Sequence, residues 1–549
     1  MAQEMDVHTI FAVSPFCVDH LQIMKQRLHA KRWHLWMGLP LCLFLFFASL
    51  SGIVLNHRTW WSHINVPQSC LPTMYRFSDW KRGAVKTSFT HRHRHYLYGT
   101  AGIWFTTDST FATAPQPFME GMEPGSDNRR MVGMVARTDG SLWAASQTGL
   151  YRLQTDDSWQ KMNLPTTPHE RMVDLQLQGD SLVLLSRSHL YLALPGQIEF
   201  TRIALPASDD YEGKISLFDM VWTLHSGEYF SLPGQLLVDA VGLVVMLLSV
   251  TGIAYFILKR TPSRKPTKTN GRKRSLRARM LGDNYRWHER MGRILFPLLL
   301  FIVVTGWMLR PPLMIPLTLV EVPPLLSTHW DTANPWMNSL QAIRYDRVQG
   351  HWLMATSRGF YTLPTLDGKP MRSPVQAPVS PMGMNMFHQT EEGDWLIGSF
   401  SGLFRVQTSG ESAVVSNFLT GERIDPSTPM RPVGRLMLSG YMAQGSKDSF
   451  LVFRYNAPPL RIWKQGTQIQ TQETPFAPVP EQLENHPLSL WQVAIEIHTG
   501  RIYTPLIGQW GALLFVFILG LLSTLVLITG YRRRRKARST THNSANGHK

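Results

Sequence analysis

The sequence predicts a membrane protein with a four-helix transmembrane bundle, built from a duplicated helix pair, and a β-rich domain built from two insertions. Three observations lead to this fold class. Four apolar runs stand out from a chain of 549 residues whose mean hydropathy is only -0.11. Dense basic clusters lie beside these runs. The phrase Trp-His-x-x-x-Gly opens two of them, at Trp33 and again at Trp287.

Each apolar run is long enough to cross the hydrocarbon core, which needs about 20 helical residues. The runs divide the chain into alternating membrane and aqueous segments. Transmembrane helices are expected at 33–57, 233–258, 287–309 and 505–530, separated by long segments at 58–232 and 310–504, a basic loop at 259–286, and terminal segments at 1–32 and 531–549.

The basic residues predict the orientation, because lysine and arginine concentrate on the cytoplasmic side of a membrane. The clusters fall before the first helix, between the second and third, and after the fourth, where Arg532 to Lys536 are all basic. Both termini and the loop 259–286 are therefore expected in the cytoplasm, and the two long segments on the other side. The formal charge of +17 is thus a juxtamembrane feature and does not predict nucleic-acid binding.

The two long segments have the pattern of β-hairpins. Gly140-Ser141-Leu142-Trp143 is followed by Gly149-Leu150-Tyr151-Arg152, and a similar pair recurs at 393–398 and 402–405. Each pair predicts a strand, a glycine-containing turn and a second strand. Repeats of this kind are typical of β-propeller blades, and a mixed β-sandwich is the alternative. The two segments are expected to pack together.

Histidine and glycine share one face of the helices that open with Trp-His-x-x-x-Gly. Gly38 lies four residues after His34, and Gly52 lies eighteen residues after His34. Gly292 and Gly306 follow His288 at the same two spacings. Eighteen residues make five turns of a regular helix, so all three positions form one stripe. An imidazole beside bare backbone leaves a flat slot, which we interpret as a haem site. The alternatives are a membrane-interface anchor for the Trp-His pairs and close helix packing for the glycines.

A second pair of histidines precedes the other two spans. His225 stands in Leu-His-Ser-Gly before the second span, and His498 in Ile-His-Thr-Gly before the fourth. Because haem iron commonly takes two axial ligands, two bis-histidine haems are expected, one at each face: His34 with His288, and His225 with His498. His57 is a further candidate ligand for the outer haem, and the sequence does not decide which two of the three outer histidines bind iron. The three cysteines show no CxxCH motif, which argues against covalently attached haem.

These motifs together resemble the PepSY-associated transmembrane family. The resemblance rests on the Trp-His-x-x-x-Gly entries, the closing Ser51-Gly52 and Thr305-Gly306, and the His-Ser/Thr-Gly entries. Within that family the chain looks most like bacterial inner-membrane ferrisiderophore reductases. The long outer segments do not show the small PepSY domain.

The resemblance implies two b-type haems in the inner membrane and electron flow from the cytoplasmic side to a periplasmic ferric siderophore, which releases Fe(II). No dinucleotide- or flavin-binding motif is visible, so the donor is expected to be a separate reductase, a free flavin or a quinol. One alternative is an electron-transfer subunit for a periplasmic redox partner. Another is a haem-free sensor or assembly protein whose outer domain binds a partner.

Overall fold

The computed structural model describes residues 15–167, 170–260, 276–325, 334–380, 383–409, 412–425, 433–443, 449–465 and 468–545. The chain forms two compact units. A helical unit takes residues 1–56, 215–329 and 494–549, and a β-rich unit takes 57–214 and 330–493. Much of the basic loop and the ends of both termini lie outside the described residues, so the predicted orientation stays a prediction.

The helical unit contains the four expected apolar elements. Three helices are long and apolar enough to cross a membrane, and a bent pair makes a fourth candidate span. The apolar stretches of the three long helices carry few charged residues. The helices are α1 (Pro15–Asn56), α4 (Ser231–Arg260), the pair α5 (Leu276–Ile294) and α6 (Phe296–Met308), and α10 (Thr504–Ala545).

The third span is not the single regular helix expected at 287–309. The chain bends by 68° between α5 and α6. Leu295 leaves the helical conformation, and Pro297 stands in the first turn of α6. Proline has no N–H for the carbonyl four residues earlier, and its ring clashes with that carbonyl, so the helix restarts there. His288 lies on α5 and Gly306 on α6, so the expected common stripe does not extend across this span.

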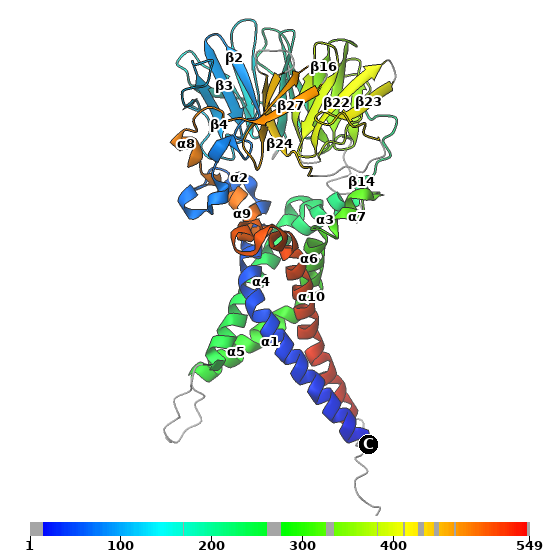
Figure 1. The fold of residues 1–549 in the computed structure, drawn as a ribbon. Helices are drawn as coiled ribbons and strands as arrows, with labels where there is room; N and C mark the ends of the chain where they lie inside the picture. The colour runs from blue at the N-terminus through cyan, green and yellow to red at the C-terminus, as the bar shows by residue number, and fades with distance from the viewer. Residues whose placement is uncertain are drawn as a thin grey trace, which may run out of the picture. The chain divides into compact units, whose positions relative to one another are not determined.

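The helices of this unit pack in a continuous bundle. α1 lies against both α4 and α10, α10 lies against α6, and α4 lies against α5 (Figure 1). Asn56 donates from Nδ2 to Asp239 at 2.9 Å, which joins the ends of α1 and α4. Two short helices, α3 (Leu217–Ser226) and α9 (Leu490–His498), precede α4 and α10.

The unit boundaries differ from the expected segment boundaries. The helical unit begins again at Ile215, well before the expected boundary at 232, because α3 packs against α6 and α7 (Met314–Leu319). The short strands β14 (Ile215–Ser216) and β15 (Glu321–Val322) pair beside it. These contacts place the residues around His225 with the helices.

The β-rich unit consists of antiparallel meanders of four strands. Four sheets have four strands each, and an eight-stranded sheet is two further meanders joined by one parallel pairing, Thr87 with Tyr441. The described residues therefore form six blade-like meanders. Their strands are β2 (Thr87–His91), β3 (Arg94–Gly99), β4 (Gly102–Thr106) and β5 (Gln116–Pro117); β6 (Met131–Ala136), β7 (Leu142–Ser146), β8 (Gly149–Leu153) and β9 (Trp159–Met162); β10 (Met172–Gln178), β11 (Ser181–Ser186), β12 (Leu190–Ala193) and β13 (Thr201–Ile203); β16 (Leu340–Asp346), β17 (His351–Thr356), β18 (Gly359–Leu363) and β19 (Met371–Arg372); β20 (Met384–Gln389), β21 (Trp395–Ser399), β22 (Gly402–Ser409) and β23 (Ser412–Asn417); β24 (Leu438–Ala443), β25 (Ser449–Arg454), β26 (Leu460–Gln465) and β27 (Gln468–Glu473).

The first strands of the meanders contact one another in a closed order. β2 contacts β6, followed by β10, β16, β20 and β24, and β24 returns to β2. This is the topology of a six-bladed propeller with three blades from each long segment. The propeller-like interpretation is confirmed over the sandwich, and the two segments do pack together. The repeated glycine phrases are the hairpins between second and third strands, where Gly102, Gly359 and Gly402 take positive φ angles that suit glycine.

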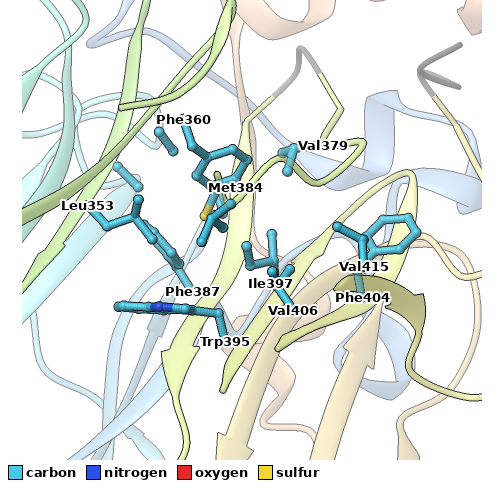
Figure 2. Packing of buried hydrophobic residues seen from close by; sticks show 13 residues of the cluster. Leu353, Phe360, Val379, Met384, Phe387, Trp395, Ile397, Phe404, Val406 and Val415 are labelled. Carbon is cyan, nitrogen blue, oxygen red and sulfur yellow. The ribbon is translucent and has the colours of Figure 1, made fainter. Parts of the chain in front are cut away.

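Between neighbouring blades lie separate apolar clusters. Figure 2 shows the one between β16–β19 and β20–β23, where Trp395 is 1% exposed and lies against Phe387, with 4.9 Å between ring centroids. The indole Nε1 of Trp395 donates to Asp346 at 3.3 Å. A buried aromatic side chain with a satisfied polar atom contributes both area and orientation to such a core.

Trp395→Ala is expected to destabilise the propeller by about 3–5 kcal/mol, because it opens a cavity and leaves the Asp346 carboxylate short of a donor. The denaturant midpoint of the full-length protein in detergent measures the change. Trp463→Ala is the matched control, since Trp463 is only half-buried on β26. Equal losses for the two variants would contradict the assignment of Trp395 to the core.

Candidate histidine sites in the helix bundle

His225 lies on α3, and its ring rests on α6. Its Nδ1 is 3.1 Å from the carbonyl oxygen of Ile302 and 3.1 Å from Oγ1 of Thr305. A Cβ added at Gly306 would lie 2.7 Å from Cε1 of His225, closer than real Cβ contacts allow. The bare backbone of Gly306 is therefore what lets the imidazole approach α6.

His498 repeats this arrangement on α1. It ends α9, and its Nδ1 is 2.9 Å from the carbonyl oxygen of Ala48 and 3.2 Å from Oγ of Ser51. A Cβ at Gly52 would lie 3.4 Å from Cε1 of His498. Gly52 thus faces an imidazole supplied by another helix.

The remaining two histidines, His34 and His288, pack in the same way against a neighbouring helix, at the other ends of the spans. Nδ1 of His34 is 3.1 Å from the carbonyl oxygen of Val526 on α10, and a Cβ at Gly530 would lie 3.1 Å from its Cε1. Nδ1 of His288 is 2.9 Å from Oγ1 of Thr251 on α4, with Gly252 beside the ring.

A Ser/Thr-Gly pair near the end of each span therefore adjoins one histidine. The contacts of the first half recur in the second, as a duplicated helix pair predicts. Where Ser51, Thr251 and Thr305 bond Nδ1, each hydroxyl also donates to a carbonyl of its own helix. The hydroxyl proton is then in use, so Nδ1–H is the donor toward it. This hydrogen bond fixes the tautomer and leaves Nε2 as the nitrogen with a free lone pair.

The histidines form two pairs across the bundle. The ring centroids of His34 and His288 are 6.5 Å apart, and those of His225 and His498 are 6.2 Å apart. Metal–imidazole bonds of about 2 Å place the centroids of two opposite ligands roughly 6.3 Å apart. Both pairs therefore have the spacing of two axial ligands on one metal. Two nitrogens leave a tetrahedral zinc shell incomplete, whereas haem brings its own four in-plane nitrogens. The residues fit haem.

The pairs lie near opposite ends of the spans. His34 and the Gly52 that adjoins His498 are eighteen residues apart on α1, a rise of about 27 Å. His57 is a member of the β-rich unit, where its ring stacks on Trp60 with 4.3 Å between centroids and 12° between planes.

The glycines fall into two groups. Gly52 and Gly306 accommodate imidazoles, which is a different role from the direct haem contact that the stripe suggested. Gly38 and Gly292 lie one turn beyond His34 and His288. A Cβ at Gly38 would meet Val526 at 3.9 Å, and one at Gly292 would meet no atom within 4 Å. These two leave bare backbone beside the pair.

Sequence reasoning did not assign a role to Ser51, Thr251, Thr305, Gly252 or Gly530. The signal was the recurrence of Ser/Thr-Gly in all four spans. Which helix receives which histidine depends on packing between segments hundreds of residues apart, and the spacing within one span does not contain that information.

The structure thus defines a membrane protein with three to four long apolar helices and a large propeller-like β domain. The model of the PepSY-associated TM region matches residues 31–533. The chain belongs to this family.

The solved structures that resemble this chain do so at low identity and with low TM-scores. A virginiamycin B lyase from Staphylococcus aureus is 7% identical with a TM-score of 0.35, and the match covers 72% of this chain and 85% of that one. The extracellular domain of the one-component system BT4673 from B. thetaiotaomicron is 10% identical with a TM-score of 0.29, covering 71% and 38%. No curated protein matches the chain.

Proposed function

We propose that this protein is a dihaem reductase of the bacterial inner membrane that passes electrons from the cytoplasmic side to a periplasmic ferric siderophore. The observation that supports it most is the spacing of the two histidine pairs, 6.5 Å and 6.2 Å between ring centroids. The pairs recur with the same supporting contacts at both ends of the spans. A structural anchor would not need two imidazoles opposed at a metal-binding distance.

The protein's own residues hold and orient the ligands. The hydroxyls of Ser51, Thr251 and Thr305 accept the Nδ1 protons of His498, His288 and His225, so that Nε2 of these three rings can bind a metal. Haem bound at each pair would supply one-electron redox chemistry, with a potential tuned by these axial ligands and their hydrogen bonds. Gly38 and Gly292 keep side chains away from the space beside the His34–His288 pair.

Arg310 lies beside the His225–His498 pair and could bind a carboxylate of a haem there. Arg310 donates to the carbonyl of Thr499, the residue after His498, at 3.3 Å. Arg293 lies one turn after Glu289 and is paired with it at 2.8 Å, near the other pair. Arg501 is similarly paired with Glu496 at 2.8 Å. Arg310 is the cation that we assign to a propionate.

The net reaction is the transfer of one electron to each ferric complex. The donor, a cytoplasmic reductase, a reduced flavin or a quinol, is oxidised, and Fe(III) in the chelate becomes Fe(II). Fe(II) is held less tightly by hard oxygen donors, so it leaves the chelate.

The test is an optical spectrum with haem quantification on full-length protein made with ample haem. Two haems per chain are expected, and reduced protein should be reoxidised by a ferric hydroxamate. Reoxidation only by a periplasmic protein fraction would favour an electron-transfer subunit instead. A folded, colourless preparation would overturn the proposal and favour a haem-free sensor.

Gly306→Ala is expected to lower the haem content by about one per chain, because the new Cβ would lie 2.7 Å from Cε1 of His225. Gly520→Ala is a control of equal steric demand, since its Cβ would lie 2.7 Å from Trp307. Haem per chain, measured by pyridine haemochrome, distinguishes them. Equal haem loss in both variants would mean that bundle packing, and not the position of His225, decides haem content.

A further inference from the structure

Arginines gather where the inner strands of two blades begin. Arg130 directly precedes β6, Arg171 directly precedes β10, and Arg187 lies in the turn between β11 and β12. The backbone N–H of Gln147 donates to the carbonyl of Arg130 at 2.9 Å, and that of Arg187 to the carbonyl of Arg171 at 2.9 Å. These bonds place the strand starts and the turns at the same end of the two blades.

A fourth arginine joins them from α2 (Arg58–Trp61). Arg58 donates to Oε1 of Gln147 at 3.1 Å and forms a two-pronged ion pair with Asp127, at 2.7 and 2.8 Å. Its guanidinium also lies 4.4 Å from the ring centroid of Trp491. We call Arg58, Arg130, Arg171 and Arg187 the arginine rim.

The charge of the rim is poorly balanced. Asp127 is the acid that faces it, and both of its oxygens are taken by Arg58. Glu170 precedes Arg171 but binds elsewhere, with its oxygens 2.8 Å from Nδ1 of His189 and 2.8 Å from the hydroxyl of Tyr191. Arg187 donates to the carbonyl of Asn338.

Arg130 and Arg171 are the members of the rim whose guanidinium groups can still bind an anion. Neither forms an ion pair with another described residue, and Nε of Arg130 is buried without a hydrogen-bond partner. Burial, together with the charges of Arg58, Arg130 and Arg187, lowers the pKa of Arg171 to about 9. Burial also lowers the pKa of Arg130, although Asp127 opposes the change. Burial and the neighbouring positive charges thus destabilise the cationic forms of Arg130 and Arg171, and an anion bound nearby would stabilise them.

We propose that the arginine rim is a binding site for an oxyanion ligand, a carboxylate or a phosphate, with Arg130 and Arg171 as its main contacts. A planar guanidinium binds either group through two parallel N–H donors. Although protein atoms closely surround the Arg171 guanidinium, the residue keeps exposed surface through which a ligand can approach. Arg58 and Arg187 are fixed by their protein partners and supply the surrounding positive potential. The site lies wholly within the β-rich unit and requires no haem.

The test uses full-length protein in phosphatidylcholine nanodiscs, with citrate and inorganic phosphate as probes at matched ionic strength. Wild-type protein should bind at least one probe, measured by calorimetry. Arg171→Gln and Arg130→Gln should each weaken binding at least tenfold. Arg202→Gln is the control, since Arg202 is exposed on β13 of the same blade as Arg171. It should bind as wild type does.

The thermal midpoint without ligand separates binding from folding. Removing one cation from an unbalanced cluster should leave the midpoint unchanged or raise it, whereas loss of a structural arginine would lower it. A third arm replaces the lipid with phosphatidylglycerol. A midpoint shift in that arm alone that depends on Arg171 would identify the anion as a lipid phosphate. No response in any arm, or binding that survives both substitutions, would overturn the proposal.

Discussion

His288→Ala is expected to remove one of two haems from the purified protein and to leave the other in place. The imidazole of His288 lies opposite that of His34, with 6.5 Å between centroids, so its loss would leave the proposed haem at this pair with a single protein ligand. Haem per chain should fall from about two to about one. The reduced spectrum should then show one bis-histidine species.

Two further variants make this prediction sharp. His34→Ala should have the same effect, and the double variant should lose no more haem than either single variant, because we propose that both histidines bind one iron. His63→Ala is the control, since His63 is an exposed histidine of the β-rich unit. If the double variant loses two haems, His34 and His288 do not bind the same haem iron.

His498→Ala is expected to remove the haem that His288→Ala leaves, whereas His57→Ala should retain both. His498 faces His225 with 6.2 Å between centroids and is held by Ala48 and Ser51. His57 instead stacks on Trp60. Haem quantification and low-temperature electron paramagnetic resonance of the oxidised protein report which bis-histidine signal disappears.

Comparing the His57→Ala, His225→Ala and His498→Ala variants also decides which two of these three histidines bind the outer haem, a question that the sequence left open. If His57→Ala loses a haem and His498→Ala or His225→Ala does not, His57 is the ligand, and the assigned pair is wrong. The double variant His288→Ala/His498→Ala should be free of haem, and its circular dichroism should show that the helices persist.

Much of the architecture could be predicted because it depends on short, local sequence patterns. The apolar runs have the length that the bilayer demands, and the glycine hairpins of the blades repeat within short windows. The grouping of His34 with His288 and of His225 with His498 followed from matching motifs in the two halves. The structure brings these pairs together.

Other features depend on contacts between distant segments. Pro297 lies near the start of the apolar run, and periodicity alone gave no sign of a 68° bend. The stripe from His288 to Gly306 was wrong for that reason. The role of Gly306 depends on a histidine eighty-one residues earlier in the chain, and the arginine rim exists only when two blades and α2 come together.

The division of the propeller into two sets of three blades has a consequence for biogenesis. β2 and β24 meet through the single pairing of Thr87 with Tyr441, so the ring closes between the start of one long segment and the end of the other. During translation the first three blades emerge, and then two membrane spans must insert before their partners are made. For that interval the half-ring presents unpaired strand edges, which invite aggregation. A chaperone that shields these edges is therefore expected to affect the yield of this protein more than that of a propeller encoded in one stretch.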